Sequence, residues 1–403
     1  MIADADLHLH SRFSGATSPK MQMKVLASES KKKGMHILGT GDCLHPQWIQ
    51  EIKEGTPTDG LIEIEDTYFL LSTEVEDEHR VHHLLFFPSF SAIEQFRESI
   101  RKFTSNMNSD GRPNLHLNGA GIASRAKEAD ALIGPAHAFT PWTALYGYHD
   151  SLESCYEDMV GYLAFLELGL SADTTYADTI GELHRLSFLS NSDSHSPYPV
   201  RLAREFNRLQ ITDFTWDDIK KALLRQGGRK IILNVGFPPQ KGKYNQTACT
   251  RCYHQYTLQD ADAHKWKCSC GGRIKKGVKD RISELSTLPS GQHPSHRPPY
   301  LYLLPLAEII SHAIGQSSPY TKAVQSRWDE LITAFGNEVS VLLDRPIEDI
   351  NRVTVPVIAD AIQSFREKKI KIYPGGGGKY GEIELPRGTE EQKQNTQKTI
   401  FDY

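Results

Sequence analysis

The chain has 403 residues, more than one ordinary hydrophobic core needs and enough for two or three domains. Its hydrophobic fraction of 39% and charged fraction of 24% are those of a soluble globular protein, and its net charge of −4 excludes a general attraction to polyanions. No apolar run approaches the roughly 20 residues that span a bilayer, and the acidic start lacks a signal-peptide pattern. We therefore expect a cytoplasmic protein with no membrane partner.

Residues 1–235 predict repeated strand–helix units. Amphipathic segments at 20–33, 91–103 and 215–225 have helical periodicity. The segments that alternate with them predict strands at 3–10, 36–39, 68–73, 81–87, 131–134, 162–167, 187–190 and 230–233. This alternation is typical of a mainly parallel sheet or an α/β barrel, so we predict an α/β fold.

The stretch "ADADLHLHSRFS" at 3–14 begins with the first predicted strand and carries ionisable side chains at alternate positions. Asp4, Asp6, His8 and His10 share one face of it, which makes a poor core. Polar clusters also end later strands, in "GTGD", "STEVE", "GPAHAF" and "SNSDSH". In α/β barrels the chemistry lies on the loops that follow the strands. The candidate ligands of a metal centre there are His8, His10, Asp42, Glu74, His83, His137, Asp193 and His195.

Imidazoles and carboxylates together suit Zn²⁺, Mn²⁺ or Fe²⁺. Several such groups predict a multinuclear centre with Glu74 as a bridge, which activates water and clamps a phosphate during in-line displacement. We expect His8, His10, Asp42, Glu74, Asp193 and His195 to be catalytic, with Zn²⁺ as the ion and Mg²⁺ or Mn²⁺ as alternatives. Only one of the adjacent His82 and His83 can face the centre, and we select His83. Asp42 alone is also compatible with a helix cap or turn.

Four of the six cysteines form C-x₂-C-x₁₅-C-x-C, at Cys249, Cys252, Cys268 and Cys270. This spacing predicts a structural Zn²⁺ site on two knuckles. Aromatic and basic residues surround it, and Lys275 and Lys276 are candidates for contact with DNA. The alternative is a solvated basic face around a structural zinc.

Two further segments are candidates for phosphate binding. If "VRLAREFNR" at 200–208 is helical, Arg201, Arg204 and Arg208 share one face beside the metal centre. An exposed charged face explains the pattern equally well. "PGGGGKYGE" at 374–382 lacks the Walker A spacing, but its glycines allow close approach to a phosphate and Lys379 adds charge. A flexible turn is the alternative.

The remaining chain predicts a linker or ordered extended loop at 286–300, helices within 300–372, and a polar tail. The predicted domains are 1–240, a Cys module at 241–280, a helical DNA-binding domain at 281–385 and a flexible tail at 386–403. In the tail, Gln397, Ile400 and Tyr403 resemble part of a sliding-clamp-binding peptide, although the usual second aromatic is absent. A polar tail with accidental hydrophobic residues is the alternative.

The motifs "DLHLHSRFS", "GTGD", "TEVE", "VHHLL", "PAHAF" and "SNSDSH" resemble those of the polymerase and histidinol phosphatase (PHP) superfamily. The resemblance implies a distorted β/α barrel that binds up to three metals and hydrolyses phosphate esters. Two positions depart from the pattern: Phe13, Ser14 and Gly15 stand where many members have a further His, and Asp42 replaces another.

With the Cys module, the helical segment and "GPAHAFTPW", "FLELGLSAD", "RPPYL" and "PGGGGKYGEI", nearly the whole chain resembles the endonuclease Q family. That resemblance implies a nucleoid-associated DNA repair enzyme that nicks DNA 5′ of deaminated bases (uracil, hypoxanthine, xanthine) and of abasic sites. Phe13, Trp142, Tyr146 and Tyr148 are candidate stacking residues, although aromatics are more often core. The alternatives are a PHP phosphomonoesterase acting on a small metabolite and a non-catalytic, clamp-associated DNA-binding protein.

Overall fold

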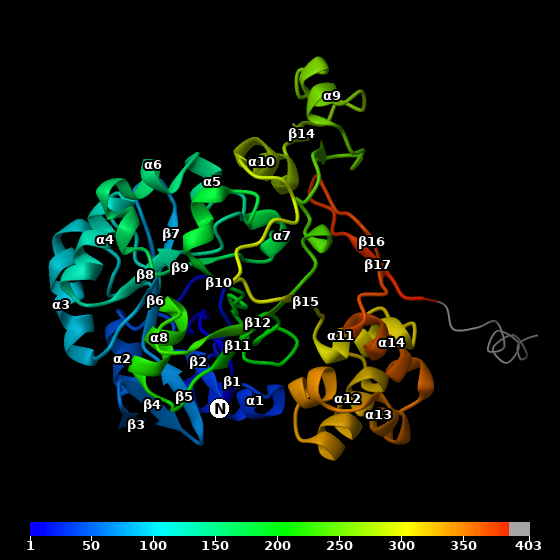
Figure 1. Cartoon of the computed structure of the whole chain (residues 1–403), viewed down its shortest axis with the longest axis horizontal. Helices are drawn as coiled ribbons and strands as arrows, with labels where there is room; N and C mark the ends of the chain where they lie inside the picture. Colours follow the sequence, from blue (N-terminus) through cyan, green and yellow to red (C-terminus); the bar gives the residue numbers. More distant parts are fainter. Residues whose placement is uncertain (387–403) are drawn as a thin grey trace, which may run out of the picture.

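The computed structural model describes residues 1–386, which form an N-terminal α/β domain, a small Cys module and a helical domain (Figure 1). The α/β domain contains every strand that the sequence predicts, with shifted ends. Its strands are β1 (Ile2–Asp6), β2 (Ile37–Gly39), β3 (Thr56–Thr58), β4 (Leu61–Ile64), β5 (Thr67–Leu70), β6 (Ser72–Glu76), β7 (His82–Phe86), β8 (Leu132–Pro135), β9 (Phe165–Glu167), β10 (Ser187–Leu189), β11 (Phe206–Gln210) and β12 (Lys230–Gly236). Its helices are α1 (Met23–Lys33), α2 (Pro46–Ile52), α3 (Phe90–Ile100), α4 (Gly119–Glu128), α5 (Leu145–Tyr148), α6 (Leu152–Tyr156), α7 (Thr174–Ala177) and α8 (Trp216–Leu224).

The strands form a distorted barrel. One sheet has the order β15-β12-β11-β1-β2-β5-β4-β3, in which β15 (Tyr300–Tyr302) comes from a later segment, and β6-β7-β8 and β9-β10 form two more. Backbone hydrogen bonds join the sheets, from Phe87 N to Leu71 O (2.9 Å) and from Ala164 N to Ile133 O (3.0 Å). The remaining gap, between β10 and β11, is bridged by the side chain of Asn207, which donates to Ser190 O (2.9 Å).

The sheets are mixed rather than mainly parallel as the sequence predicts. β6, β7 and β8 pair antiparallel, and so do β1, β11 and β12. Residues 200–208, for which a helix was one interpretation, are a turn that runs into β11. Strand β11 is fixed by a partner far away in sequence, since the Arg208 guanidinium is paired with Asp4 of β1 (2.8 Å).

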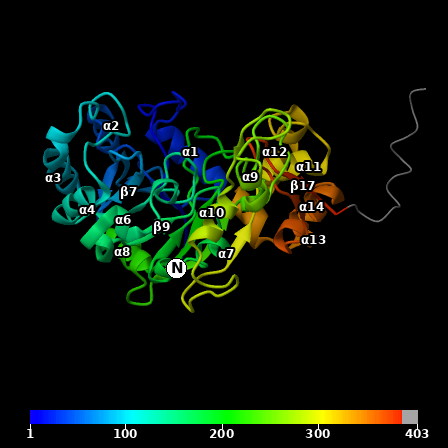
Figure 2. The ribbon, with the colours of Figure 1, turned by 90° about the horizontal axis from the view of Figure 1, so that it is seen from above.

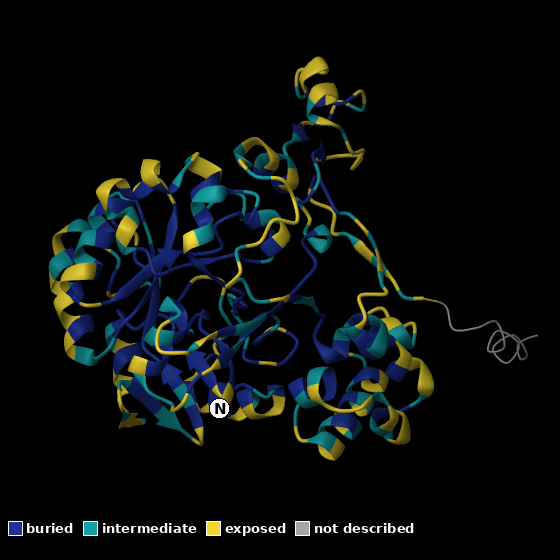
Figure 3. Cartoon of the chain, viewed as in Figure 1, coloured by how far each residue is buried: buried dark blue, intermediate teal, exposed yellow. Residues whose placement is uncertain are grey.

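Both faces of β1 are buried (Figure 3). Ala3, Ala5 and Leu7 pack in an apolar cluster. On the other face Asp6 accepts hydrogen bonds from the backbone N–H groups of Ser192 and Ala203, each at 3.0 Å. Asp4 and Asp6 therefore tie β1 to later segments, which leaves His8 and His10 for the site.

The Cys module projects from the body of the molecule, with α9 at its tip (Figure 1). It consists of the antiparallel pair β13 (Ala248–Cys249) and β14 (Ile274–Lys275) and the helix α9 (Leu258–Ala263). The following helix α10 (Val278–Leu285) returns to the α/β domain, where Arg281 donates to the carbonyls of Tyr146 (2.9 Å) and His149 (3.0 Å).

The segment after α10 is an ordered extended loop that also belongs to the α/β domain. Its Arg297 forms a buried ion pair with Asp178 (2.8 Å), and β15 (Tyr300–Tyr302) pairs in parallel with β12. The helical domain therefore begins near residue 305 rather than at 281, because residues 300–302 complete the large sheet. It contains α11 (Leu306–Ala313), α12 (Lys322–Phe335), α13 (Ile347–Val353) and α14 (Pro356–Arg366), as the sequence predicts, and lies on the side of α1 (Figure 2).

A hairpin of β16 (Lys371–Tyr373) and β17 (Glu382–Glu384) ends the described chain. Three of the four N–H groups of its successive glycines donate to backbone carbonyls and so are not free for a phosphate. Gly375 N donates to Gln240 O (2.9 Å) and Gly378 N to Lys243 O (2.9 Å). Gly377 has φ +63°, and a Cβ there would collide with the carbonyl of Cys249. Within residues 1–386 no helix is long and apolar enough to cross a membrane, and the predicted clamp-binding residues Gln397, Ile400 and Tyr403 lie outside that range.

Candidate metal centre

The H-x-H pair lies directly after β1 and beside the D-x-H motif. Leu9 forms an isolated parallel bridge with Ser194, and His10 N donates to Ser194 O (3.0 Å). This bridge brings His8 and His10 next to Asp193 and His195, about 185 residues later in the sequence. The first pair is buried, whereas the side chains of Asp193 and His195 are 34% and 33% exposed, so they form the open side of the centre.

Three groups of side chains meet here, and each has ligand atoms within 4.8 Å of one another. The first is His8, His10 and Glu74, in which His10 Nε2 lies 3.4 Å from Glu74 Oε2. The second is Glu74, His82 and His137, in which both histidines lie 2.9 Å from Glu74 Oε1. The third is His10, Asp193 and His195, with 3.1 Å between His10 Nε2 and Asp193 Oδ1. Glu74 and His10 are each shared by two groups.

The selection of His83 over His82 is wrong. Adjacent residues of β7 point to opposite faces, and it is His82 that faces Glu74. His83 points away, where its Nδ1 bonds the hydroxyl of Tyr156 (2.7 Å) and its Nε2 lies 3.3 Å from Asp77. The composition of the strand gave no indication of which face turns inward.

Asp42 lies behind His10 and in none of the three groups. One of its oxygens is 3.0 Å from His10 Nδ1, and the other accepts from Ser11 N (2.6 Å) and the Ser14 hydroxyl (2.8 Å). Its carboxylate thus orients His10 so that Nε2 faces the centre, in the manner of groups that support metal-binding histidines. The structure does not place it as a direct ligand.

Glu167, which the sequence analysis missed, does the same for His8. Its carboxylate lies 2.9 Å from His8 Nδ1 and accepts from His137 N (2.8 Å) and the Asn191 amide (2.8 Å). Its place as the last residue of a predicted strand was a signal that could have found it. Arg112 was also missed, and its guanidinium lies 3.1 Å from Glu74 Oε2.

The charges of the centre depend strongly on one another. Burial lowers the pKa of His8, but Glu167, Glu74 and Asp193 outweigh burial and raise it to about 9. Burial raises the pKa of Glu74, but His82, His10 and His137 outweigh it and hold this pKa well below its usual value. Glu74 is therefore ionised and available as a ligand.

The donor set fits metal ions. The buried atoms His8 Nε2, His10 Nε2 and Asp193 Oδ1 have no hydrogen-bond partner among the described residues. Unpaired buried polar atoms are costly and rare, and here several converge on one place. The four cysteine sulfurs of the Cys module also lie within 4.8 Å of one another, with 3.5 Å between Cys249 and Cys270 and between Cys252 and Cys268. Such spacing matches the edges of a tetrahedron around Zn²⁺, about 3.8 Å for bonds of about 2.3 Å.

The predicted phosphate-binding residues lie in different settings. Arg208 is neutralised by Asp4 and Asp344, and Arg204 donates to Ser192 O (3.1 Å), so both hold the fold beside the centre. Lys276 pairs with Glu284 (2.5 Å) and Lys379 with Glu382 (3.0 Å). Arg201 is exposed in the turn before β11.

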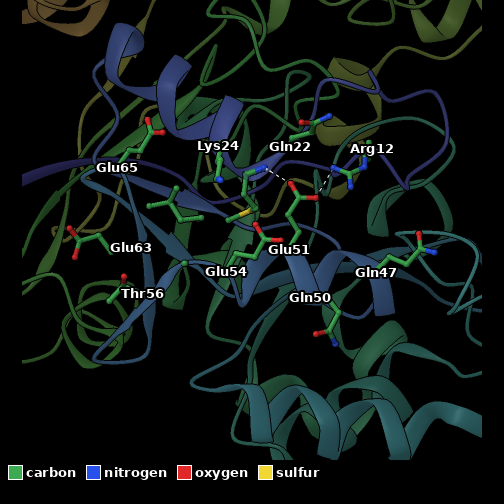
Figure 4. A pocket seen from close by; sticks show the side chains of 13 residues that line it. Arg12, Gln22, Lys24, Gln47, Gln50, Glu51, Glu54, Thr56, Glu63 and Glu65 are labelled. Atoms are coloured by element: carbon green, nitrogen blue, oxygen red, sulfur yellow. Dashed lines mark hydrogen bonds and ion pairs between the residues drawn. The ribbon is translucent and has the colours of Figure 1, made fainter.

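A polar groove of about 580 Å³ lies beside α2 (Figure 4). Glu51, Glu54, Glu63 and Glu65 line it, and Arg12 is paired with Glu51 (2.6 Å). This excess of carboxylates would repel a DNA backbone.

Comparison with known proteins extends over most of the chain. The family described as MJ0043 C-terminal domain matches residues 305–369. The protein MJ0043 of Methanocaldococcus jannaschii is 49% identical over 253 residues, which are 61% of this chain but only 31% of that protein, so the match covers about a third of its length. The protein YqxK of Bacillus subtilis is 32% identical over 94% of this chain and 98% of its own.

Two solved structures are similar over nearly their whole length. The lesion-specific endonuclease Q of Pyrococcus furiosus has a TM-score of 0.93, with 51% identity over 96% of both chains. An endonuclease Q in complex with a 27-mer duplex carrying an abasic lesion at the active site has a TM-score of 0.89, with 51% identity over 96% of this chain and 97% of that one.

The mixed α/β barrel, its imidazole–carboxylate centre and these whole-length similarities define an endonuclease, a hydrolase of phosphodiester bonds. Within that class, the resemblance of the sequence to the endonuclease Q family is confirmed over the α/β domain, the Cys module and the helical domain. The chain belongs to the endonuclease Q family of lesion-specific endonucleases.

Proposed function

We propose that this protein nicks duplex DNA on the 5′ side of deaminated bases and abasic sites. The observation that supports it most is the row of three adjacent ligand groups, which share Glu74 and His10 and open to the surface at Asp193 and His195. A phosphodiester is an extended substrate and needs such an open side. The likeness to a structure with an abasic duplex in its active site points to the same substrate.

We propose Zn²⁺ for the four cysteines and Zn²⁺, Mn²⁺ or Mg²⁺ for the centre. His8, His10, Glu74, His82, His137, Asp193 and His195 would hold the ions there. Bound ions would supply an activated water and charge stabilisation for the phosphoryl oxygens. Asp42 and Glu167 would fix the ring orientation of His10 and His8, and Arg112, 3.1 Å from Glu74, would add positive charge near the scissile phosphate.

The direct test uses the purified full chain with duplexes that each carry one deoxyuridine, deoxyinosine, deoxyxanthosine or abasic site, in Mg²⁺, Mn²⁺ or Zn²⁺. We expect a single nick 5′ of each lesion, with a 3′-hydroxyl that a polymerase extends and a 5′-phosphate that permits ligation. An undamaged duplex and the Asp193→Asn variant are the controls. Hydrolysis of a small phosphomonoester without nicking would favour the metabolite phosphatase instead, and DNA binding without either reaction would favour the non-catalytic alternative.

The sliding clamp and association with the nucleoid remain proposals. Gln397, Ile400 and Tyr403 would contact the clamp, with Ile400 and Tyr403 in an apolar pocket. Calorimetry with the clamp of the same organism tests this: we expect heat of binding that disappears in the Ile400→Ala/Tyr403→Ala double variant.

A further inference from the structure

The loop between β8 and α5 is fixed to two histidines of the metal centre. Thr140 N donates to the carbonyl of His137 (2.8 Å), and Thr143 O accepts from the backbone N–H of His82 (3.1 Å). Tyr146 N closes the loop by donating to Ala138 O (3.1 Å). The backbone of this loop is therefore held in a fixed position relative to His82 and His137.

That end is occupied by Trp142, which is 52% exposed and has φ +91°. A left-handed backbone is costly for a bulky residue and persists where the surrounding structure imposes it, often at functional sites. The conformation is held by the hydroxyl of Tyr148, which donates to Trp142 O (2.6 Å). The loop thus maintains an unfavourable backbone conformation while it presents a large aromatic ring to solvent.

The Cys module adds a cation and a second ring to Trp142. The Lys275 ammonium lies over the Trp142 ring and 5.1 Å from the centre of the Tyr244 ring. The two aromatic rings are 6.1 Å apart and nearly perpendicular, at 87°. Among residues 1–386 no carboxylate lies within 4 Å of this ammonium. Burial, with the nearby Arg273, lowers its pKa to about 8, so an added anion would be favourable beside it.

We propose that Trp142, Tyr244 and Lys275 form a stacking site for the nucleobase next to the lesion. Trp142 would fill the space left when the lesion nucleotide rotates out of the helix, and Lys275 would contact a flanking phosphate. This inference rests on the proposed function. The reason is geometric: His8 and His10 are buried, so a scissile phosphate reaches them only from a distorted duplex, and a distorted duplex exposes a base face. Aromatic rings and nearby cations bind exposed base faces with little dependence on sequence.

The test separates extrusion from chemistry. Single-turnover nicking by the full chain is measured on a duplex with paired deoxyuridine and on the same duplex with the deoxyuridine in a single-nucleotide bulge, where stacking is already lost. We expect Trp142→Ala to nick the paired lesion about tenfold more slowly or worse, as befits the loss of one stacked base. It should nick the bulged lesion within about twofold of wild type. Trp142→Phe should be close to wild type on both substrates.

Tyr320→Ala removes an equally exposed aromatic from the helical domain and should change neither rate. Equal slowing of Trp142→Ala on both substrates, or slowing on neither, overturns the inference. If the wild-type chain nicks no lesion, the proposed function fails, and a binding assay tests the stacking site instead. The fluorescence of 2-aminopurine beside the lesion should be quenched more by wild type than by Trp142→Ala. Equal quenching by the two proteins would overturn the stacking site.

Discussion

The ammonium of Lys33 and the carboxylate of Glu338 form an ion pair of 2.7 Å in which both side chains are at most 2% exposed. Lys33 ends α1 of the α/β domain, and Glu338 follows α12 of the helical domain. Glu338 also accepts hydrogen bonds from Leu306 N (2.8 Å) and Trp328 Nε1 (3.0 Å), so both of its carboxylate oxygens have partners. The pair fixes how the two domains dock.

Lys33→Met should lower the free energy of unfolding by about 3–5 kcal/mol, because it leaves Glu338 buried without its countercharge. Urea denaturation measures the loss. The matched control is the adjacent Lys32→Met, whose ion pair with Glu29 is on the surface and should be worth less than about 1 kcal/mol. Similar losses in the two variants would show that the buried pair does not stabilise docking.

Asp42→Asn should weaken metal binding at the centre about 10–100-fold, because the amide no longer holds His10 as the carboxylate does. Nicking should fall with it and recover in part at higher metal concentration. Metal titration followed by calorimetry gives the affinity, and Asp66→Asn at an exposed ion pair is the control. Activity that is lost without any change in affinity would argue against an orienting role.

His82→Gln and His83→Gln distinguish the two faces of β7. We expect His82→Gln to lose nicking and bound metal, because its ring lies 2.9 Å from Glu74. His83→Gln should keep its metal content and nicking, although its melting temperature falls through loss of the contacts with Asp77 and Tyr156. Mass spectrometry of the native proteins counts the ions. The reverse pattern would restore His83 as the ligand.

Glu205 gives stability a pH dependence. Burial raises its pKa from 4.5 to about 8, and the second carboxylate oxygen has no partner among the described residues. Between these pH values the unfolded chain has released the proton and the folded chain keeps it, so this group makes stability fall as pH rises from about 4.5 to about 8. Glu205→Gln should flatten that part of the curve, measured by urea denaturation at pH 5, 6.5 and 8. An unchanged slope would mean that Glu205 is ionised in the folded protein.

The alternation of residues along the chain was sufficient to predict most of the metal centre. His8 and His10 follow one strand and the D-x-H motif follows another, so the local pattern alone predicts that both motifs lie at the same end of the barrel. The pattern could not decide between His82 and His83, because it does not say which face of β7 turns inward. It also left a helix open for the segment of Arg208, since nothing local reveals a partner in Asp4, 204 residues away. Glu167 was missed for a related reason: its role is defined by the ring of His8 in another strand.

The glycine hairpin of β16 and β17 joins two distant segments of the chain through backbone hydrogen bonds. The backbone from 240–249 meets the backbone of 375–381, so everything between these two points is a loop whose ends are joined. The Cys module and the helical domain both lie between these two joined segments in the sequence. The Cys module and the helical domain are therefore joined by these backbone hydrogen bonds as well as by the chain between them. A substitution that weakens the glycine hydrogen bonds should therefore loosen the Cys module and the helical domain together, at a place outside the metal centre.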